Sequence, residues 1–273
     1  MFADGTCRVA ATQMTTPMIS YAQNFEDVML RRVLCHVQRG YYVDVGAQDA
    51  TIDSVTRWFY DCGWSGINID PHPDYYAQLV LERPRDINLK VALSDAEGEA
   101  QFCFVRDSGL SSLDLSAASV AAGHGLRSDV GTVMLSTLDA VLAAHPLPEI
   151  HFLKIDVEGA EAKVLAGVDL RKHRPWVILV EATEPTRTDT TWHQFESLII
   201  ERGYRCVYFD GLNTWYLRNE SVALIEHFRL PPNVFEAFVR WREHAWSQRT
   251  PGPAYATRQP AASAQGFKGL FGK

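Results

Sequence analysis

Short apolar runs alternate along this chain with stretches in which apolar residues recur at helical spacing. Five runs rich in β-branched and aromatic residues predict buried strands, at residues 41–45, 66–70, 87–93, 152–157 and 176–181. Helical stretches lie between them, at residues 51–62, 74–82 and 160–167. Strands that alternate with helices in this way predict an α/β fold, with a parallel sheet and helices on both of its faces.

Two regions depart from this alternation. Residues 99–105 and 131–136 predict two strands of an inserted hairpin, and a Ser- and Gly-rich connection between them is expected to cover the mouth of a crevice. Residues 204–209 and 214–217, joined through a turn that contains Gly211, predict an antiparallel hairpin that closes the sheet. The sequence therefore predicts a seven-stranded, mostly parallel sheet with an inserted hairpin.

The two ends of the chain differ from this central region. Residues 1–18 are polar and aperiodic, which predicts a flexible N-terminal arm before a domain at 19–230. Ser20 could cap the first helix of that domain. Apolar residues at helical spacing predict a C-terminal helix at 231–249. Residues 250–273 are rich in Pro, Ala, Gly, Ser and Gln, which predicts a disordered tail.

Composition excludes some classes of function. The chain has 273 residues, of which 47% are hydrophobic and 22% charged, as in ordinary globular proteins. Its net charge of −7 argues against nonspecific binding of nucleic acid or anionic membrane. No apolar run approaches the roughly 20 residues that span a bilayer. Five scattered cysteines without a CxxC pair and a start without a signal-peptide pattern predict a cytoplasmic protein.

The first two strands end in residues suited to a nucleoside. Tyr41–Val45 carries Asp44 and reaches Gly46, where the missing Cβ lets the backbone approach a ligand closely. The helix start that follows leaves amides unpaired. The second strand ends at Asp70, whose carboxylate could accept the two hydroxyls of a ribose. These strand ends predict a crevice for a nucleoside-containing cofactor.

Acidic residues also follow the later strands. Asp156 and Glu158 end the strand that begins at residue 152, and Glu181 ends the next one. The first two could act as a base and as a contact for a cofactor amine, or they could hold a divalent cation that polarises an acceptor hydroxyl. Alternatively, Glu158 simply begins the next helix, where a carboxylate is favourable. Glu181 is placed at the edge of the sheet expected to face an acceptor.

Several segments resemble one protein family in the same order. VDVGAQDA, NIDPHP and FLKIDVEGAE resemble the FkbM-type family of S-adenosylmethionine-dependent O-methyltransferases, and SYAQNFEDVML, VALSDAEG and STLDAVL resemble further segments of it. The similarity extends roughly from residue 20 to 218. It implies a Rossmann-like class I methyltransferase fold and S-adenosylmethionine as the cofactor. It also implies that the acceptor is a hydroxyl of a sugar, a glycan precursor or a secondary metabolite.

The resemblance also implies roles for particular residues. Asp44 would face the methionine end of the cofactor, Asp70 would bind the ribose, and the segment around Glu26 would form a wall of the crevice. The cofactor-binding residues expected in all are Asp44, Gly46, Ala47, Asp49, Asp70, Ser94 and Asp95. Catalysis would fall to Asp156, Glu158 and Glu181. A turn-forming Ser94-Asp95 pair explains those two residues equally well.

The chain departs from the usual family loop at two positions, and two other functions compete with methyl transfer. Gln48 replaces the commoner Asn and Ala50 the commoner Gly, which is expected to shift the start of the following helix slightly. An NAD-dependent oxidoreductase would share the strand–turn–acid arrangement, but the GxGxxG loop is missing and only Gly46 is present. A non-catalytic binding module would keep the fold and tolerate the loss of Asp156 and Glu158. The sequence leaves the acceptor, the metal dependence, the base and the oligomeric state open.

Overall fold

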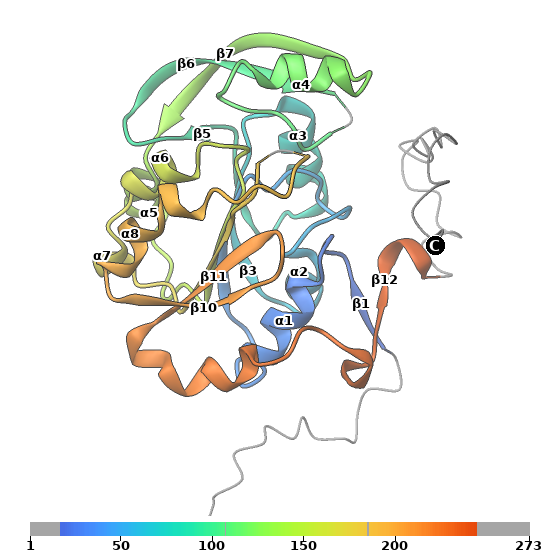
Figure 1. Cartoon of the computed structure of the whole chain (residues 1–273), viewed down its shortest axis with the longest axis vertical. Coiled ribbons are helices and arrows are strands. Elements are labelled where there is room, and N and C mark those ends of the chain that lie inside the picture. The colour runs from blue at the N-terminus through green and yellow to red at the C-terminus, as the bar shows by residue number, and fades with distance from the viewer. Residues whose placement is uncertain (1–16, 107, 185, 245–273) are drawn as a thin grey trace, which may run out of the picture.

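A seven-stranded sheet forms the centre of the molecule (Figure 1). The structure is a computed structural model that describes residues 17–106, 108–184 and 186–244. The strands of the sheet are β2 (Tyr41–Val45), β3 (Ser65–Ile69), β4 (Ile87–Leu89), β8 (Phe152–Ile155), β9 (Val177–Glu181), β10 (Tyr204–Phe209) and β11 (Asn213–Arg218). They lie side by side in the order β10-β11-β9-β8-β2-β3-β4.

The sheet is mixed, which corrects the prediction of a mostly parallel one. The pairs β9–β8, β8–β2, β2–β3 and β3–β4 are parallel, but β11 runs antiparallel to both β9 and β10. A short turn at residues 210–212 connects β10 to β11, and a connection of that length allows only antiparallel pairing. The closing hairpin itself was predicted and is confirmed.

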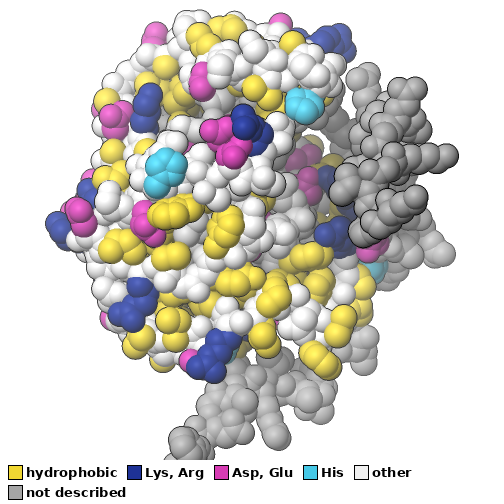
Figure 2. Space-filling model, viewed as in Figure 1, with side chains coloured by type: hydrophobic (Ala, Val, Ile, Leu, Met, Phe, Trp, Pro, Cys, Tyr) yellow, Lys and Arg dark blue, Asp and Glu magenta, His cyan; other side chains and the backbone are white. Residues whose placement is uncertain are grey.

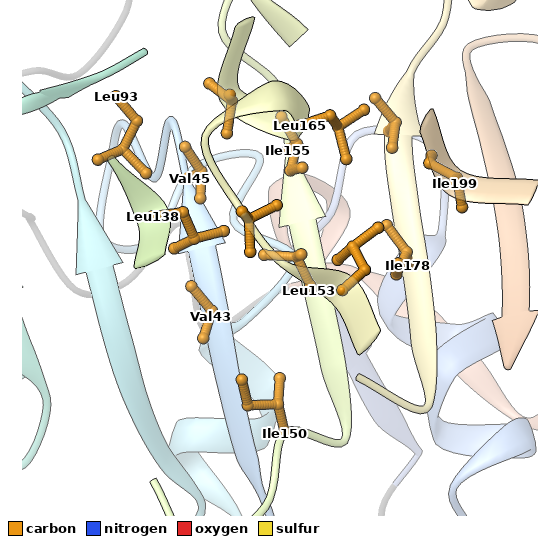
Figure 3. Close-up of a cluster of buried hydrophobic side chains, with 14 of the residues drawn as sticks. Val43, Val45, Leu93, Leu138, Ile150, Leu153, Ile155, Leu165, Ile178 and Ile199 are labelled. Carbon is orange, nitrogen blue, oxygen red and sulfur yellow. The ribbon is translucent and has the colours of Figure 1, made fainter. Parts of the chain in front are cut away.

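Two apolar clusters cover the two faces of this sheet. One lies between the sheet and four helices, α5 (Leu138–Ala144), α6 (Glu161–Ala166), α7 (Leu170–His173) and α8 (Glu196–Ile200). Figure 3 shows Val43, Leu153 and Ile178 among its members. The other lies under α1 (Glu26–Val33), α2 (Arg57–Asp61) and the 3₁₀ segment η2 (Asn219–Phe228). The predicted helices at both faces are therefore present.

Alternation along the strands assigns each side chain to one of these faces. Tyr42 and Phe152 pack on the α1–α2 side, whereas Val43 and Leu153 pack on the α5–α8 side. Because successive strand residues point to opposite faces, the next polar pair returns to the α1–α2 side. The backbone register places these two polar residues, Asp44 and Lys154, directly opposite each other on neighbouring strands.

A second, smaller sheet confirms the inserted hairpin. It comprises β5 (Ala92–Leu93), β6 (Gly98–Val105) and β7 (Ser128–Ser136), with α4 (Ala117–Gly123) between β6 and β7. β6 pairs antiparallel with β7 over the whole length of β6. Residues 98–136, called the insert below, lie at one end of the main sheet (Figure 1). The predicted strand at 87–93 is divided, because its second half leaves the main sheet and pairs with β7.

The remaining helices differ in length from their predictions. α3 (Pro73–Glu82) has nearly the predicted bounds, and its proline stands at the start of the helix, where no amide donor is needed. α2 begins at Arg57, six residues later than predicted. Within the residues that precede it, Asp53 adopts a positive φ of 58° that a helix does not accommodate.

The predicted C-terminal helix is wrong over the described residues. Residues 233–244 form two short 3₁₀ turns, η3 (Val234–Glu236) and η4 (Trp241–Glu243), around a strand, β12 (Phe238–Arg240). Ala237 has a left-handed φ of 48°, and Val234, which was expected on the apolar face of that helix, is 88% exposed. β12 instead pairs in parallel with β1 (Met18–Ser20). The tertiary pairing has therefore overridden the helical periodicity.

The N-terminal end of the domain also differs from its prediction. Met18, assigned to the flexible arm, is buried in β1, and Ser20 belongs to that strand instead of capping a helix. The rest of the predicted arm, residues 1–16, and the predicted tail at 250–273 lie outside the described residues. Among the helices that the structure describes, none has the length and hydropathy of a membrane span.

Candidate active site

The loop after β2 brings three strand ends together. Gly46 has a φ of +76°, and a Cβ at this position would lie 1.7 Å from the carbonyl oxygen of Asp156. The Gly46 amide donates to the Ile69 carbonyl at 2.9 Å, which ties the loop to the end of β3. Only glycine fits here, because both the backbone angle and the close approach of β8 exclude a side chain. Gly46, predicted to allow close approach to a ligand, also allows close approach of the protein backbone.

Asp70 fixes the same loop from the end of β3. Its two carboxylate oxygens accept the backbone amides of Gln48 and His72, each at 2.8 Å. The side chain is buried, and desolvation raises the pKa of Asp70 to about 6. Each carboxylate oxygen has a further lone pair, so both can also accept a ligand hydroxyl. Asp70 is thus oriented before any ligand binds.

A small hollow, called the strand-end hollow below, lies at these strand ends. Its walls include Gly46, Asp70 and Val157 from the main sheet and Phe102 and Leu113 from the insert. Apolar walls with one carboxylate suit a nucleoside, because its flat base can pack against the walls and its ribose hydroxyls can donate to the carboxylate. The hollow has a volume of about 40 Å³.

Five of the residues predicted to bind the cofactor do not line this hollow, namely Asp44, described below, and Ala47, Asp49, Ser94 and Asp95. Asp49 accepts the amides of Thr51 and Ile52 at 2.8 and 2.7 Å and so caps the turn that follows it. Ala47 is buried beside α3. Ser94 donates its hydroxyl to Asp95 at 3.0 Å, as a turn-forming pair would. The residues just before this pair, Ala92 and Leu93, do line the hollow.

Asp44 lies beside the hollow in a buried ionic cluster built on Lys154. The Lys154 ammonium donates to the Gly46 carbonyl at 2.9 Å and contacts Asp44 Oδ1 at 3.4 Å and Asp156 Oδ2 at 3.2 Å. Thr56 donates to the second oxygen of Asp44 at 3.0 Å. Burial disfavours the charge of Lys154, but Asp156 and Asp44 outweigh it and raise its pKa. Lys154 therefore stays charged and links β2 to β8.

Asp156, Glu158 and Glu181, called the carboxylate cluster below, are brought together by β8 and β9. Oxygen atoms of the three side chains all lie within 4.8 Å of one another. Desolvation and then the charge of Asp156 raise the pKa of both Glu158 and Glu181, and Glu181 also hydrogen-bonds to Asp156. Like charges this close cannot all ionise, so the cluster retains a proton at neutral pH.

The carboxylate cluster also contains an oxygen with no partner. Among the described residues, Glu158 Oε2 is buried and accepts no hydrogen bond. Such an acceptor fits a cation or a hydroxyl donor, because an unpaired buried carboxylate oxygen is otherwise costly. The prediction that Glu158 begins a helix is not met: α6 starts at Glu161, and Glu158 has a left-handed φ of 53°.

The start of α1 lies at the same edge of the sheet. Glu26 is buried, and its Oε1 accepts the side-chain amide of Asn213 at 2.9 Å. Asn213 is paired in register with Glu181 on the neighbouring strand, which places this contact next to the carboxylate cluster. Desolvation raises the pKa of Glu26 to about 7. Sequence reasoning did not single out Asn213, because a polar residue in a turn gives no signal of its partner.

The described surface is hollowed below the insert, and acidic and basic side chains lie within this recess (Figure 2). The fold and the site together define an α/β protein whose acidic strand ends meet at one edge of its sheet. A model of the methyltransferase FkbM domain matches residues 44–206, which is more than half of the chain. The chain therefore belongs to the FkbM methyltransferase family, as the sequence resemblance predicted. No curated protein and no solved structure gave a match.

Proposed function

We propose that this protein is an S-adenosylmethionine-dependent O-methyltransferase with a Rossmann-like class I fold. The observation that carries the proposal is the adjacency of two sites, the strand-end hollow at Gly46 and Asp70 and the carboxylate cluster beside it. Asp70 would accept the ribose hydroxyls, and the apolar walls of the hollow would hold the adenine. The acidic side chains around Lys154 would face the cationic methionine end.

The residues of the chain would bind the cofactor, orient the acceptor and accept its proton. Bound S-adenosylmethionine supplies an electrophilic methyl group on a positively charged sulfur. Orientation of the acceptor against this methyl group accounts for much of the rate of such a displacement. A hydroxyl acceptor must also lose its proton as the new bond forms. The raised pKa of Glu158 and its unpaired Oε2 make it our candidate for that base.

Glu181 and Asp156 would act as a hydrogen-bonded pair that holds the base in place. Glu181 is buried, and desolvation followed by the charges of Asp156 and Glu158 raises its pKa, so we assign the shared proton to Glu181, which would donate to Asp156. Asp156 in turn contacts Lys154. In this arrangement Lys154 would balance the charge of Asp156, and Glu181 would be neutral. Glu158 could then take up or release a proton.

A divalent cation is a second candidate for the carboxylate cluster. Three carboxylate oxygens within 4.8 Å of one another are the donor type that Mg²⁺ and Ca²⁺ prefer. If a cation is required, EDTA should abolish methyl transfer and added Mg²⁺ should restore it in the wild type but not in Glu181→Gln. Full activity after EDTA treatment would favour Glu158 acting as a base without metal.

The acceptor that we propose is a hydroxyl of a sugar, a glycan precursor or a secondary metabolite, in a cytoplasmic setting. The support is the family resemblance for the acceptor and, for the compartment, the scattered cysteines without a CxxC pair. Incubation with S-adenosylmethionine labelled with tritium in the methyl group and fractionated extract of the source cells would identify the acceptor pool.

Titration with S-adenosylmethionine in a calorimeter tests the proposal directly. We expect the wild type to bind, and Asp70→Ala to bind at least tenfold more weakly. Asp129→Ala is a matched control, because it removes an exposed acid of the insert that pairs only with surface Arg106 among the contacts described. No heat at millimolar cofactor would refute the proposal. Cofactor binding with full function in Glu158→Gln would instead indicate a non-catalytic binding module.

A further inference from the structure

A loop of the insert lies across the strand-end hollow. Residues 108–113, called the roof loop, connect β6 to the segment before α4, and Ser111 and Leu113 of this loop line the hollow. The loop is fastened at two points. The hydroxyl of Tyr75 on α3 donates to the Ser108 carbonyl at 3.1 Å, and the hydroxyl of Ser112 donates to the Glu158 carbonyl at 2.7 Å.

The position of Ser112 is fixed by the insert. Its backbone exchanges two hydrogen bonds with Cys103 on β6, at 2.8 and 3.0 Å. Its hydroxyl also accepts the amide of Asp114 at 2.9 Å, which leaves the hydroxyl proton to point toward Glu158. With 2% of its surface exposed, Ser112 is as deeply buried as a core residue. Contacts within the insert therefore orient the Ser112 hydroxyl toward the Glu158 carbonyl.

The acceptor residue is held in an unfavourable conformation. Glu158 has a φ of 53°, a left-handed backbone conformation that is costly for a residue with a Cβ. A hydrogen bond to its own carbonyl offsets part of that cost. If Glu158 returned to an ordinary backbone angle, its side chain would turn away from Asp156 and Glu181, because rotation about φ moves the whole side chain.

We propose that Ser112 is a positioning residue for Glu158. The hydrogen bond from the roof loop holds the Glu158 backbone so that its carboxylate stays within the carboxylate cluster. The Ser112 contact, rather than closure of the roof loop as a whole, therefore holds the base in place. This inference rests on the proposed function, in which Glu158 accepts the proton of the acceptor.

Variants at the two fastening points distinguish positioning from simple closure. Ser112→Ala should lower the rate of tritium transfer at saturating S-adenosylmethionine by five- to tenfold and change the calorimetric Kd for this cofactor by less than twofold. Ser112→Thr keeps the hydroxyl and should recover the rate to within twofold. Tyr75→Phe loosens only the roof, so it should raise the Kd and leave the saturated rate within twofold. Thr132→Val, which removes an exposed hydrogen bond of the insert, is the control.

A double variant tests whether Ser112 acts through Glu158. In a Glu158→Gln background, Ser112→Ala should change the residual rate by less than twofold, because the group it positions is gone. An unchanged rate in Ser112→Ala, an equal loss in both backgrounds, or the same loss in Tyr75→Phe would overturn the inference. Ser112→Cys provides the same comparison if Ser112→Ala does not fold. Failure of the wild type to bind S-adenosylmethionine would instead overturn the proposed function.

Discussion

Replacement of Lys154 by methionine should destabilise the protein in a way that depends strongly on pH. The Lys154 side chain is 9% exposed and lies 3.4 Å from Asp44 and 3.2 Å from Asp156. At an effective dielectric constant of about 20, each of these contacts corresponds to an attraction of about 5 kcal/mol. The desolvation of the lysine opposes this attraction. Loss of one partner from a buried ion pair therefore lowers the free energy of unfolding by about 3–5 kcal/mol.

The pH dependence follows from the carboxylates that Lys154→Met leaves behind. Without the ammonium, Asp44 and Asp156 are left as carboxylates with no cation beside them, and a buried unpaired charge is costly. Protonation removes that charge, so the deficit should be larger at pH 8 than at pH 5. Asp44→Asn added to Lys154→Met removes a buried charge and should recover part of the deficit at pH 8.

Urea denaturation followed by circular dichroism at pH 5 and pH 8 measures this effect. Lys90→Met is the matched control, because Lys90 is exposed and its loss should change the free energy of unfolding by less than about 0.5 kcal/mol. A deficit below about 1 kcal/mol at pH 8, or an equal deficit at both pH values, would refute the assignment of Lys154 as the counter-ion of the cluster.

Three further predictions concern the strand ends and α1. Gly46→Ala should lower the free energy of unfolding by at least about 2 kcal/mol in urea titrations, because its Cβ would lie 1.7 Å from the Asp156 carbonyl oxygen and φ is +76°. Asp70 has a pKa of about 6, so calorimetric affinity for S-adenosylmethionine should fall as the pH drops below 6, and Asp70→Asn should bind about tenfold more weakly at pH 8. Burial raises the pKa of Glu26 from 4.5 to about 7, so wild-type stability should fall by about 3 kcal/mol from this group as the pH rises from 4.5 to 7. In Glu26→Gln the fall in stability between pH 5 and pH 8 should be smaller by that amount, and an identical fall would contradict the assignment.

The strands and most helices of the domain were predictable because their local signals agree with their tertiary setting. The runs at β2, β3, β8 and β9 are buried on both faces, as strands covered by helices require, and most of their residues are apolar. The acidic residues that follow these strands were predictable as site residues, because a charged residue directly after a buried apolar run must lie at the end of the strand.

Some elements were not predictable because long-range pairing decided them. The second half of the predicted strand at 87–93 pairs with β7 instead of β3, and no local pattern distinguishes the two partners. The residues at 233–244 have helical periodicity, yet β12 pairs with β1, more than 200 residues earlier in the chain. Glu26 and Asn213 are likewise joined across 187 positions.

The residues that end the strands, and the family of the chain, are evident from the amino-acid sequence alone. Those features are local, because β-branched runs, a glycine and an acid in a fixed order have their own conformational preferences. Which charged residues contact each other is evident only in the folded protein. The register of β2 against β8 places Lys154 between Asp44 and Asp156, and the insert places Ser112 against Glu158. These contacts join strands and loops that are far apart in the chain, so the packing of the fold determines them. Burial also shifts the pKa values on which the proposed chemistry depends.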